Sequence, residues 1–245
     1  MTRKPPRAYR EGMDLLARVN AVRVGRAQTH VWDGREVRSA AVKRPVDGPV
    51  RLGPLGFDGD AQADTAVHGG PEKAALLYAG HHYPRWAAEQ GLTLPDGGFF
   101  ENVTLGDLTG SGPDETTVVL GETWRLGGAV VQVSQPRSPC WKLAQRWGVK
   151  DLVLQVQETG WSGWYIRVLE PGIVAAGDAV ELLERPAEPT VAEVARVMNR
   201  DKKDLDGARR LLRSELLPPR WRERLEKRLA GHPEDDTART QGTRA

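Results

Sequence analysis

The sequence predicts a mainly β domain, a barrel or a sandwich, with a small helical domain behind it. Between residues 18 and 183 the apolar runs are short and are separated by glycine and proline, which is typical of strands joined by turns. Gly127-Gly128 separates two of these runs and has the form of a two-residue hairpin turn. After Pro186 the apolar residues recur at helical spacing instead. This change of period places a domain border near residue 186.

The elements of the β domain follow from local runs of apolar residues. β-Branched and aromatic residues concentrate in candidate strands at 19–24, 37–42, 74–78, 116–120, 130–133 and 165–169. Tyr83, Trp86 and Ala87 recur at helical spacing, so a short amphipathic helix is predicted over 80–91. A second helix is expected within 145–157. A few short helices therefore interrupt an otherwise β-type chain.

The C-terminal part predicts three helices. The segment from Thr190 to Glu193 has the form of a capping box, and further helices are expected over 204–216 and 219–229. We expect the β domain to span residues 15–186 and the three-helix domain to span 187–230. The ends, 1–14 and 231–245, contain few apolar residues and are expected to be disordered tails.

Composition and charge limit the classes of function. The chain has 245 residues, 39% of them hydrophobic and 28% charged, as in a globular protein of one or two domains. Residues 27–185 carry 14 Lys and Arg against 20 Asp and Glu, which argues against a nucleic-acid-binding β domain. No apolar run reaches the roughly 18 residues of a membrane helix, so we expect a cytoplasmic protein without a membrane segment. The sequence leaves a homodimer open.

Cys140 is the first candidate for chemistry. It is the single cysteine of the chain, so it forms neither an intramolecular disulfide nor a cysteine-based zinc site. Pro136 and Pro139 stiffen the loop that presents it, and the cations Arg137 and Lys142 favour its thiolate form. From the local sequence alone, a buried cysteine that packs as a small hydrophobe is an equally good interpretation.

Two further segments carry candidate binding residues. His68-Gly69-Gly70 with Lys73 offers backbone amides and donors for an anion, although a Gly-Gly pair is more often only a turn. Glu101-Asn102 places an acid beside an amide that can hydrogen-bond a polar heterocycle, although it can equally cap a turn. The sequence therefore leaves a structural role open for both segments.

Taken together, these segments resemble the MOSC domain, the fold of the molybdenum cofactor sulfurase C-terminus, and within it the YiiM group with its three-helix C-terminal extension. The resemblance covers about residues 15 to 230. The matching motifs occur in the family's order and spacing: Leu55 to Asp60, Val67 to Ala74, Phe100-Glu101-Asn102, and Val133 to Cys140. Two positions depart from the family pattern, Glu122 in place of an aspartate and Phe100 in place of a glycine.

The resemblance implies a β-barrel that binds a molybdopterin-type molybdenum cofactor. Cys140 matches the molybdenum ligand, and His68 is a candidate catalytic residue. The cofactor pocket would be formed by residues of the matching motifs, namely Gly69, Gly70, Lys73, Glu101, Asn102 and Arg137. The implied function is that of a molybdenum-dependent oxidoreductase, which reduces N-hydroxylated compounds such as 6-hydroxylaminopurine and detoxifies base analogues. A separate flavoprotein reductase would supply the electrons.

Two alternatives stay open. Cys140 could carry a persulfide in a sulfur relay, in which case the sulfur would come from another protein, because no rhodanese-like or pyridoxal-phosphate-dependent domain is present in the sequence. The chain could instead carry the molybdenum cofactor without turning it over. Proton transfer would fall to His68 or to a carboxylate such as Glu101, and the sequence does not decide between them.

Overall fold

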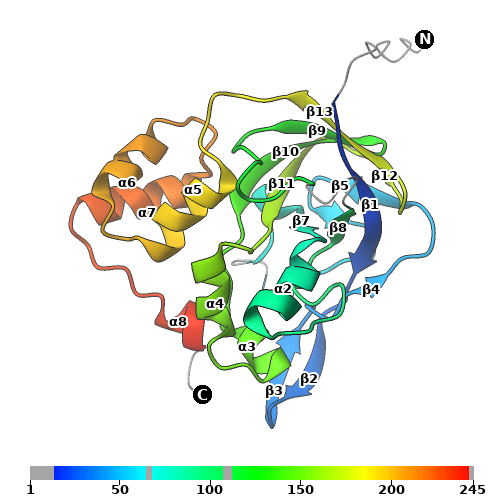
Figure 1. The fold of residues 1–245 in the computed structure, drawn as a ribbon, viewed down its shortest axis with the longest axis horizontal. Helices are drawn as coiled ribbons and strands as arrows, with labels where there is room; N and C mark the ends of the chain where they lie inside the picture. The colour runs from blue at the N-terminus through cyan, green and yellow to red at the C-terminus, as the bar shows by residue number, and fades with distance from the viewer. Residues whose placement is uncertain (1–13, 65–67, 107–111, 243–245) are drawn as a thin grey trace.

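Seven strands close into a β-barrel in the computed structural model, which describes residues 14–64, 68–106 and 112–242 (Figure 1). Around the barrel the strands follow the order β13 (Ala179–Glu184), β9 (Thr123–Leu126), β10 (Ala129–Pro136), β11 (Trp164–Glu170), β7 (Ala75–Ala79), β8 (Val103–Gly106) and β1 (Asp14–Val24). The pairing of β1 with β13 closes the ring. All neighbours are antiparallel except β7 and β8, which are parallel. The mainly β prediction is confirmed, and the architecture is the barrel.

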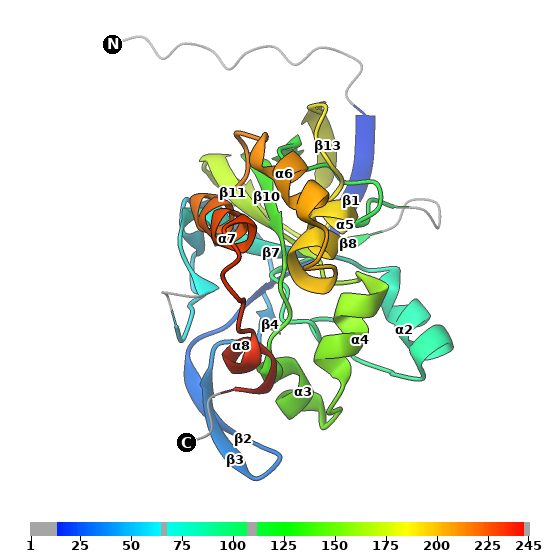
Figure 2. The same cartoon turned by 90° about the vertical axis from the view of Figure 1, so that its left-hand side faces the viewer.

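Smaller elements extend from the barrel. The hairpin of β2 (Gln28–Trp32) and β3 (Arg35–Ser39) projects as an arm (Figures 1 and 2). The short strand β4 (Arg44–Pro45) pairs with the end of β1. A separate small sheet consists of β12 (Gly172–Val174), β5 (Val50–Gly53) and β6 (Gly56–Phe57). The single turn η1 (Pro71–Lys73) leads directly into the barrel strand β7.

The barrel strand β7 is buried on both faces because each face covers a different core. Ala75 and Leu77 point into the barrel interior, where Trp124 and Trp164 meet edge to face at 5.9 Å between ring centroids. Tyr78 belongs instead to an aromatic cluster with Trp86, Phe99 and other apolar residues. This outer cluster joins the barrel to α2 (His82–Gln90), α3 (Trp141–Trp147) and α4 (Leu152–Thr159).

The C-terminal helices have a core of their own. This region comprises α5 (Val191–Ala195), a π-helical turn η2 (Arg196–Arg200), α6 (Leu205–Leu212) and α7 (Pro219–Leu229). The Thr190 side chain accepts a hydrogen bond of 3.2 Å from the Glu193 amide, as the capping-box pattern predicts. Leu120 of the β domain packs into this helical core, which fixes the two regions against each other.

Strand positions match the expectation only in part, because the strand predicted at 37–42 is β3, which ends at Ser39, and β13 was not predicted. The structure differs from the expectation at three further places. Residues 116–120 form turns and one isolated bridge rather than a strand, because the side chain of Asp114 accepts hydrogen bonds from the amide and hydroxyl of Thr116. The single helix expected within 145–157 is two helices, α3 and α4, and α3 ends at Gly148 in the left-handed conformation.

The third difference is the C-terminal tail, which we expected to be disordered. Residues 231–242 are placed against the body of the protein and contain a further helix, α8 (Thr237–Gln241). Ion pairs with the helical domain hold this segment, which is why its apolar-poor composition did not predict order. The tail expected at the N-terminus lies, apart from Asp14, outside the described residues, as do 243–245. Among the described helices, none combines the length and apolar character needed to span a membrane.

Candidate functional site

A pocket lies among the segments that follow β3 and β10 and those that precede η1 and β8. Its empty space, including the open mouth, is about 680 Å³. Five of the eight candidate site residues line it: His68, Lys73, Asn102, Arg137 and Cys140. The structure therefore brings together residues that are up to 72 positions apart in the chain.

Cys140 lies where strand β10 passes into helix α3. The strand ends at Pro136, and the amide of Arg137 donates to the carbonyl of Gly163 at 2.9 Å, so the loop leaves the barrel in a fixed direction. Cys140 is the N-cap residue of α3 in an extended conformation. The residue is 9% exposed and lines the pocket. The thiol is thus placed to reach a ligand in the pocket.

Cationic side chains dominate the charge of the pocket. Four of them, Lys43, Lys73, Arg137 and Lys142, line it against one carboxylate, Asp60. Arg137 is 3% exposed, and its Nη1 atom has no hydrogen-bond partner among the described residues. A buried charged donor without a hydrogen-bond partner is costly, so the described part of the protein leaves Nη1 unsatisfied. An anionic ligand in the pocket would satisfy it.

Burial and mutual repulsion set the protonation of two pocket residues. Burial, together with the nearby charge of Arg220 on α7, lowers the pKa of Lys73 to about 8 against the opposing effect of Cys140. Burial also lowers the pKa of His68 to about 4, helped by the charges of Lys73, Lys142 and Arg137. At neutral pH the lysine is therefore mostly protonated, whereas the imidazole is neutral.

Asn102 and Glu101 have roles that the sequence did not separate. Asn102 lines the pocket, but its side chain holds the scaffold: Oδ1 accepts from the amide of Leu76 at 3.1 Å, and Nδ2 donates to Asp60 Oδ2 at 2.9 Å. Glu101 is fully buried outside the pocket lining, where it accepts hydrogen bonds from the Tyr83 hydroxyl, the Gly97 amide and the Thr104 hydroxyl. The expectation that Glu101 contacts a cofactor or donates protons is not supported by this position.

The two glycines beside His68 also lie outside the pocket lining. Gly70 has a φ of 98° at the start of η1, and its carbonyl accepts from the amide of Lys73 at 3.0 Å. The left-handed conformation suits glycine, so Gly70 shapes the turn that carries Lys73. Its role is consistent with the simple turn that we kept as the alternative.

Sequence reasoning did not single out Lys43 and Asp60, which form a buried ion pair in the pocket wall with side chains 8% and 2% exposed. Asp60 Oδ1 also accepts from the amide of Gly25 at 2.7 Å. Asp60 is the last residue of the matching motif from Leu55 to Asp60, and this motif was the sequence signal that could have identified it as a pocket residue. Nothing in the local sequence around Lys43 indicates a pocket residue.

Phe100 forms part of the pocket wall in a conformation that is unusual for a residue with a side chain. Its φ is 69°, in the left-handed region, which explains why glycine suits this position. The ring stacks on Trp32 at 6.5 Å between centroids, and the guanidinium of Arg137 lies 5.9 Å from its centroid. Phe100 therefore introduces backbone strain that a glycine would avoid, and its ring gives the pocket an aromatic wall.

A pair of substitutions measures this exchange. Phe100→Ala and Phe100→Gly both remove the ring, but only alanine keeps a Cβ in the left-handed region, which costs roughly 1–2 kcal/mol. We expect Phe100→Gly to be more stable than Phe100→Ala by about 1 kcal/mol, the reverse of the usual order of these residues. Urea unfolding followed by circular dichroism measures the difference. A glycine variant as unstable as the alanine variant would show that the backbone is not strained at this position.

Comparison with known families identifies the class of this fold and site. Residues 64–181 match the family model of the MOSC domain, and residues 189–232 match that of the YiiM-like 3-alpha helix domain. The molecule is therefore a MOSC-domain protein with a C-terminal helical domain. The uncharacterized protein YflK of Bacillus subtilis is 42% identical over 83% of this chain and 90% of its own length. Protein YiiM of Escherichia coli is 39% identical over 83% of this chain and 91% of its own length.

The structural comparison agrees. The crystal structure of YiiM from Geobacillus stearothermophilus has a TM-score of 0.71 and 31% identity, covering 86% of this chain and 98% of that one. The chain belongs to the YiiM family of MOSC-domain proteins. A protein of Gibberella moniliformis named reductase is 37% identical over 67% of this chain but matches over only 29% of its own length.

Proposed function

We propose that this protein is a molybdenum-cofactor-dependent reductase of N-hydroxylated compounds such as 6-hydroxylaminopurine, with Cys140 as the molybdenum ligand. The observation that carries the proposal is a single buried thiol that faces a pocket lined by four cations and one carboxylate. Membership in the MOSC family and the name of the Gibberella relative support it.

The residues of the pocket fit such a cofactor. Molybdopterin carries a phosphate and a dithiolene, and a phosphate suits the excess of positive charge and the buried, unpartnered Nη1 atom of Arg137. Molybdenum favours soft sulfur ligands, so one protein thiolate can complete a coordination sphere that the dithiolene has begun. Arg137 and Lys142 would hold the phosphate, and Cys140 would hold the metal, with Lys73 beside it.

Reduction of a hydroxylamine to an amine and water takes up two electrons and two protons. The bound cofactor would supply the two-electron chemistry at the N–O bond. Lys73, with its pKa of about 8, holds a proton at neutral pH and can give it to the departing oxygen. His68, with its pKa of about 4, acts as a neutral hydrogen-bonding group. We therefore assign the stored proton to Lys73 rather than to His68 or Glu101.

The electrons would come from a separate flavoprotein reductase. The match covers only 29% of the Gibberella protein, so the name reductase describes more than the matched region. The natural substrate would be a small N-hydroxylated purine or a related compound that fits the open mouth of the pocket.

Metal analysis tests the central assignment. We expect wild-type protein, purified from a host that makes molybdenum cofactor, to contain about one molybdenum atom per chain. Inductively coupled plasma mass spectrometry measures this content. Cys140→Ser should lower that content at least about tenfold, because serine keeps the size of the side chain but lacks the soft thiolate. Reduction of 6-hydroxylaminopurine with a chemical electron donor should fall in parallel.

Equal molybdenum in the wild type and in Cys140→Ser would exclude the thiolate as the ligand. Wild-type protein without molybdenum, when a control molybdoenzyme from the same host is loaded, would exclude the cofactor. A mass about 32 Da higher on Cys140 after exposure to a sulfur donor would instead favour the sulfur relay, because that mass corresponds to a persulfide.

A further inference from the structure

The C-terminal segment 231–242 reaches the loop that carries Cys140. Helix α8 of this segment lies beside α3, the helix that begins directly after Cys140 (Figure 2). Most of the segment, including all of α8, lies beyond the regions matched by the two family models, which end at residues 181 and 232. The two family models therefore say nothing about its contacts.

Arg239 of α8 directly contacts the loop that carries Cys140. Its Nη1 atom donates to the carbonyl oxygen of Pro139 at 2.6 Å and to Oε1 of Gln157 at 3.2 Å. Its Nη2 atom donates to Oδ2 of Asp236 at 2.8 Å. The arginine therefore joins the tail to the residue that precedes Cys140.

Ser138, the residue before Pro139, is held by the helical domain. The hydroxyl of Ser138 donates to Oδ1 of Asn199 at 2.8 Å, and Asn199 lies in the η2 turn of the helical domain. The carbonyl of Asn199 accepts a hydrogen bond from the side chain of Gln157 at 3.2 Å, and the same side chain accepts one from Arg239. Gln157 therefore links Asn199, which holds Ser138, to Arg239, which holds Pro139. Ser138 and Pro139 are thus both held by the C-terminal part of the chain.

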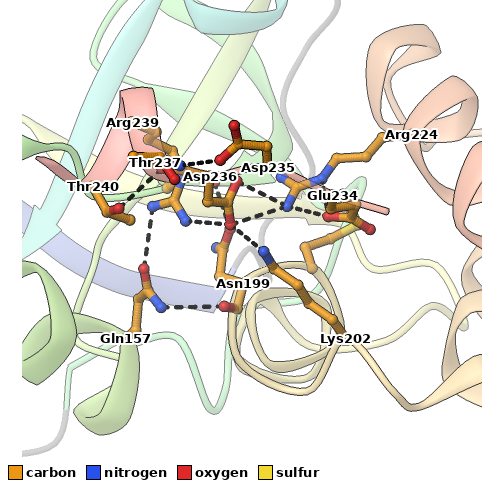
Figure 3. Close-up of polar contacts among 12 residues, drawn as sticks. Gln157, Asn199, Lys202, Arg224, Glu234, Asp235, Asp236, Thr237, Arg239 and Thr240 are labelled. Carbon is orange, nitrogen blue, oxygen red and sulfur yellow. Dashed lines mark hydrogen bonds and ion pairs between the residues drawn. The ribbon is translucent and has the colours of Figure 1, made fainter. Parts of the chain in front are cut away.

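Acidic residues anchor the tail to the helical domain. Asp236 pairs with Lys202 and with Arg224, and Glu234 pairs with Arg224 and Arg228 (Figure 3). Arg228 is 7% exposed and donates to the carbonyl of Val197 at 2.7 Å. Although burial acts to raise the pKa of Asp236, hydrogen bonds from Arg239 and Lys202 lower it below its usual range. The carboxylate that orients Arg239 therefore stays ionised at neutral pH.

We propose that the tail 231–242 is a positioning element for the reactive thiol and that Arg239 is the positioning residue. The Pro139–Cys140 peptide unit is planar, and the proline ring restricts rotation on its other side. A fixed Pro139 carbonyl therefore fixes the backbone from which the Cys140 side chain projects into the pocket. The meaning of this placement for molybdenum rests on the proposed function, whereas the placement itself does not.

The reactivity of Cys140 tests the proposal in the full-length protein without cofactor. Because Cys140 is the single cysteine, the rate of iodoacetamide alkylation reports on this position alone. We expect Arg239→Ala to be alkylated about tenfold faster or more, because a loop that has lost charge-assisted hydrogen bonds opens more often. Arg239→Lys keeps the charge and one donor and should restore part of the protection.

Arg209→Ala on α6 is a matched control, because it also removes an arginine that pairs with an aspartate. The Arg209 side chain is 58% exposed and pairs with Asp206 of the same helix. This variant should react at the wild-type rate. Asp236→Asn removes the carboxylate that orients Arg239 without touching the cysteine loop, and it should also accelerate alkylation. Circular dichroism establishes that each variant is folded.

Wild-type alkylation rates in both Arg239→Ala and Asp236→Asn would overturn the proposal. Equal acceleration in Arg239→Lys and Arg239→Ala would also contradict it, because the hydrogen bond to Pro139 would then have no specific role. The outcome is separate from that of the metal analysis. Accelerated alkylation in a protein that never binds molybdenum would support the positioning role and exclude the proposed function.

Discussion

Arg137→Ala is expected to lower the reduction of 6-hydroxylaminopurine by about 100-fold or more, the usual loss when a fixed electrostatic group is removed from a site. The physical reason is that Arg137 is a buried cation in the pocket wall with Nη1 unpartnered among the described residues. Its charge is available to an anionic ligand and is costly without one. Molybdenum content should fall together with activity if Arg137 holds the cofactor phosphate.

The same substitution should not destabilise the protein without cofactor. Removal of a buried cation whose Nη1 atom has no partner among the described residues relieves a desolvation cost, so the melting temperature of Arg137→Ala should equal or exceed that of the wild type. Thermal unfolding by circular dichroism measures this. Higher stability together with lost activity is the pattern expected of a residue kept for binding rather than for folding.

Arg146→Ala is the matched control for Arg137→Ala. The two guanidinium groups lie at similar distances from the ring of Phe100, 5.7 Å for Arg146 and 5.9 Å for Arg137, but only Arg137 lines the pocket. The control should keep its activity within a few-fold of the wild type. Activity retained in Arg137→Ala, or lost equally in both variants, would show that the pocket charge does not bind the ligand.

Features determined within a few residues of sequence could be predicted. The prolines at 136 and 139 predict a stiff loop around Cys140, and Thr190 begins a helix as its capping pattern indicates. Tyr83 and Trp86 lie on a helix with the expected spacing, and both are buried. In each case short-range geometry decides the conformation, so the sequence alone contains enough information.

Features that depend on distant partners could not be predicted in this way. Asp60 meets Asn102 across 42 positions, and Arg239 meets Pro139 across 100 positions. A charged residue in such a pair looks like a solvated surface residue until the fold brings its partner near. The closure of the barrel was likewise implied by family resemblance and not by the strand patterns. The order of the C-terminal tail escaped prediction for the same reason, because its polar residues find partners only in the folded protein.

The buried pair of Asp60 and Lys43 leads to the largest expected effect on stability. Asp60→Asn should lower the free energy of unfolding by about 3–5 kcal/mol, because it leaves the buried charge of Lys43 without the carboxylate that pairs with it. Hydrogen bonding adds to the loss. Asp60 accepts from Lys43, from the amide of Gly25 and from Asn102, whereas asparagine has one acceptor oxygen for these donors.

A double-mutant cycle and a pH series identify the cause. Lys43→Met removes the unpaired charge, so the double variant Asp60→Asn/Lys43→Met should be more stable than Asp60→Asn alone.

Burial already lowers the pKa of Lys43, and the charge of Asp60 opposes that shift. Without Asp60 the pKa of Lys43 falls further, and the unfolded chain then binds more protons than the folded one. The stability of Asp60→Asn should therefore rise relative to wild type as the pH increases through the folded pKa of Lys43 toward 10. Urea unfolding across that range measures the change, and a penalty that is independent of pH and unchanged by Lys43→Met would assign the loss to the hydrogen bonds of Gly25 and Asn102 instead.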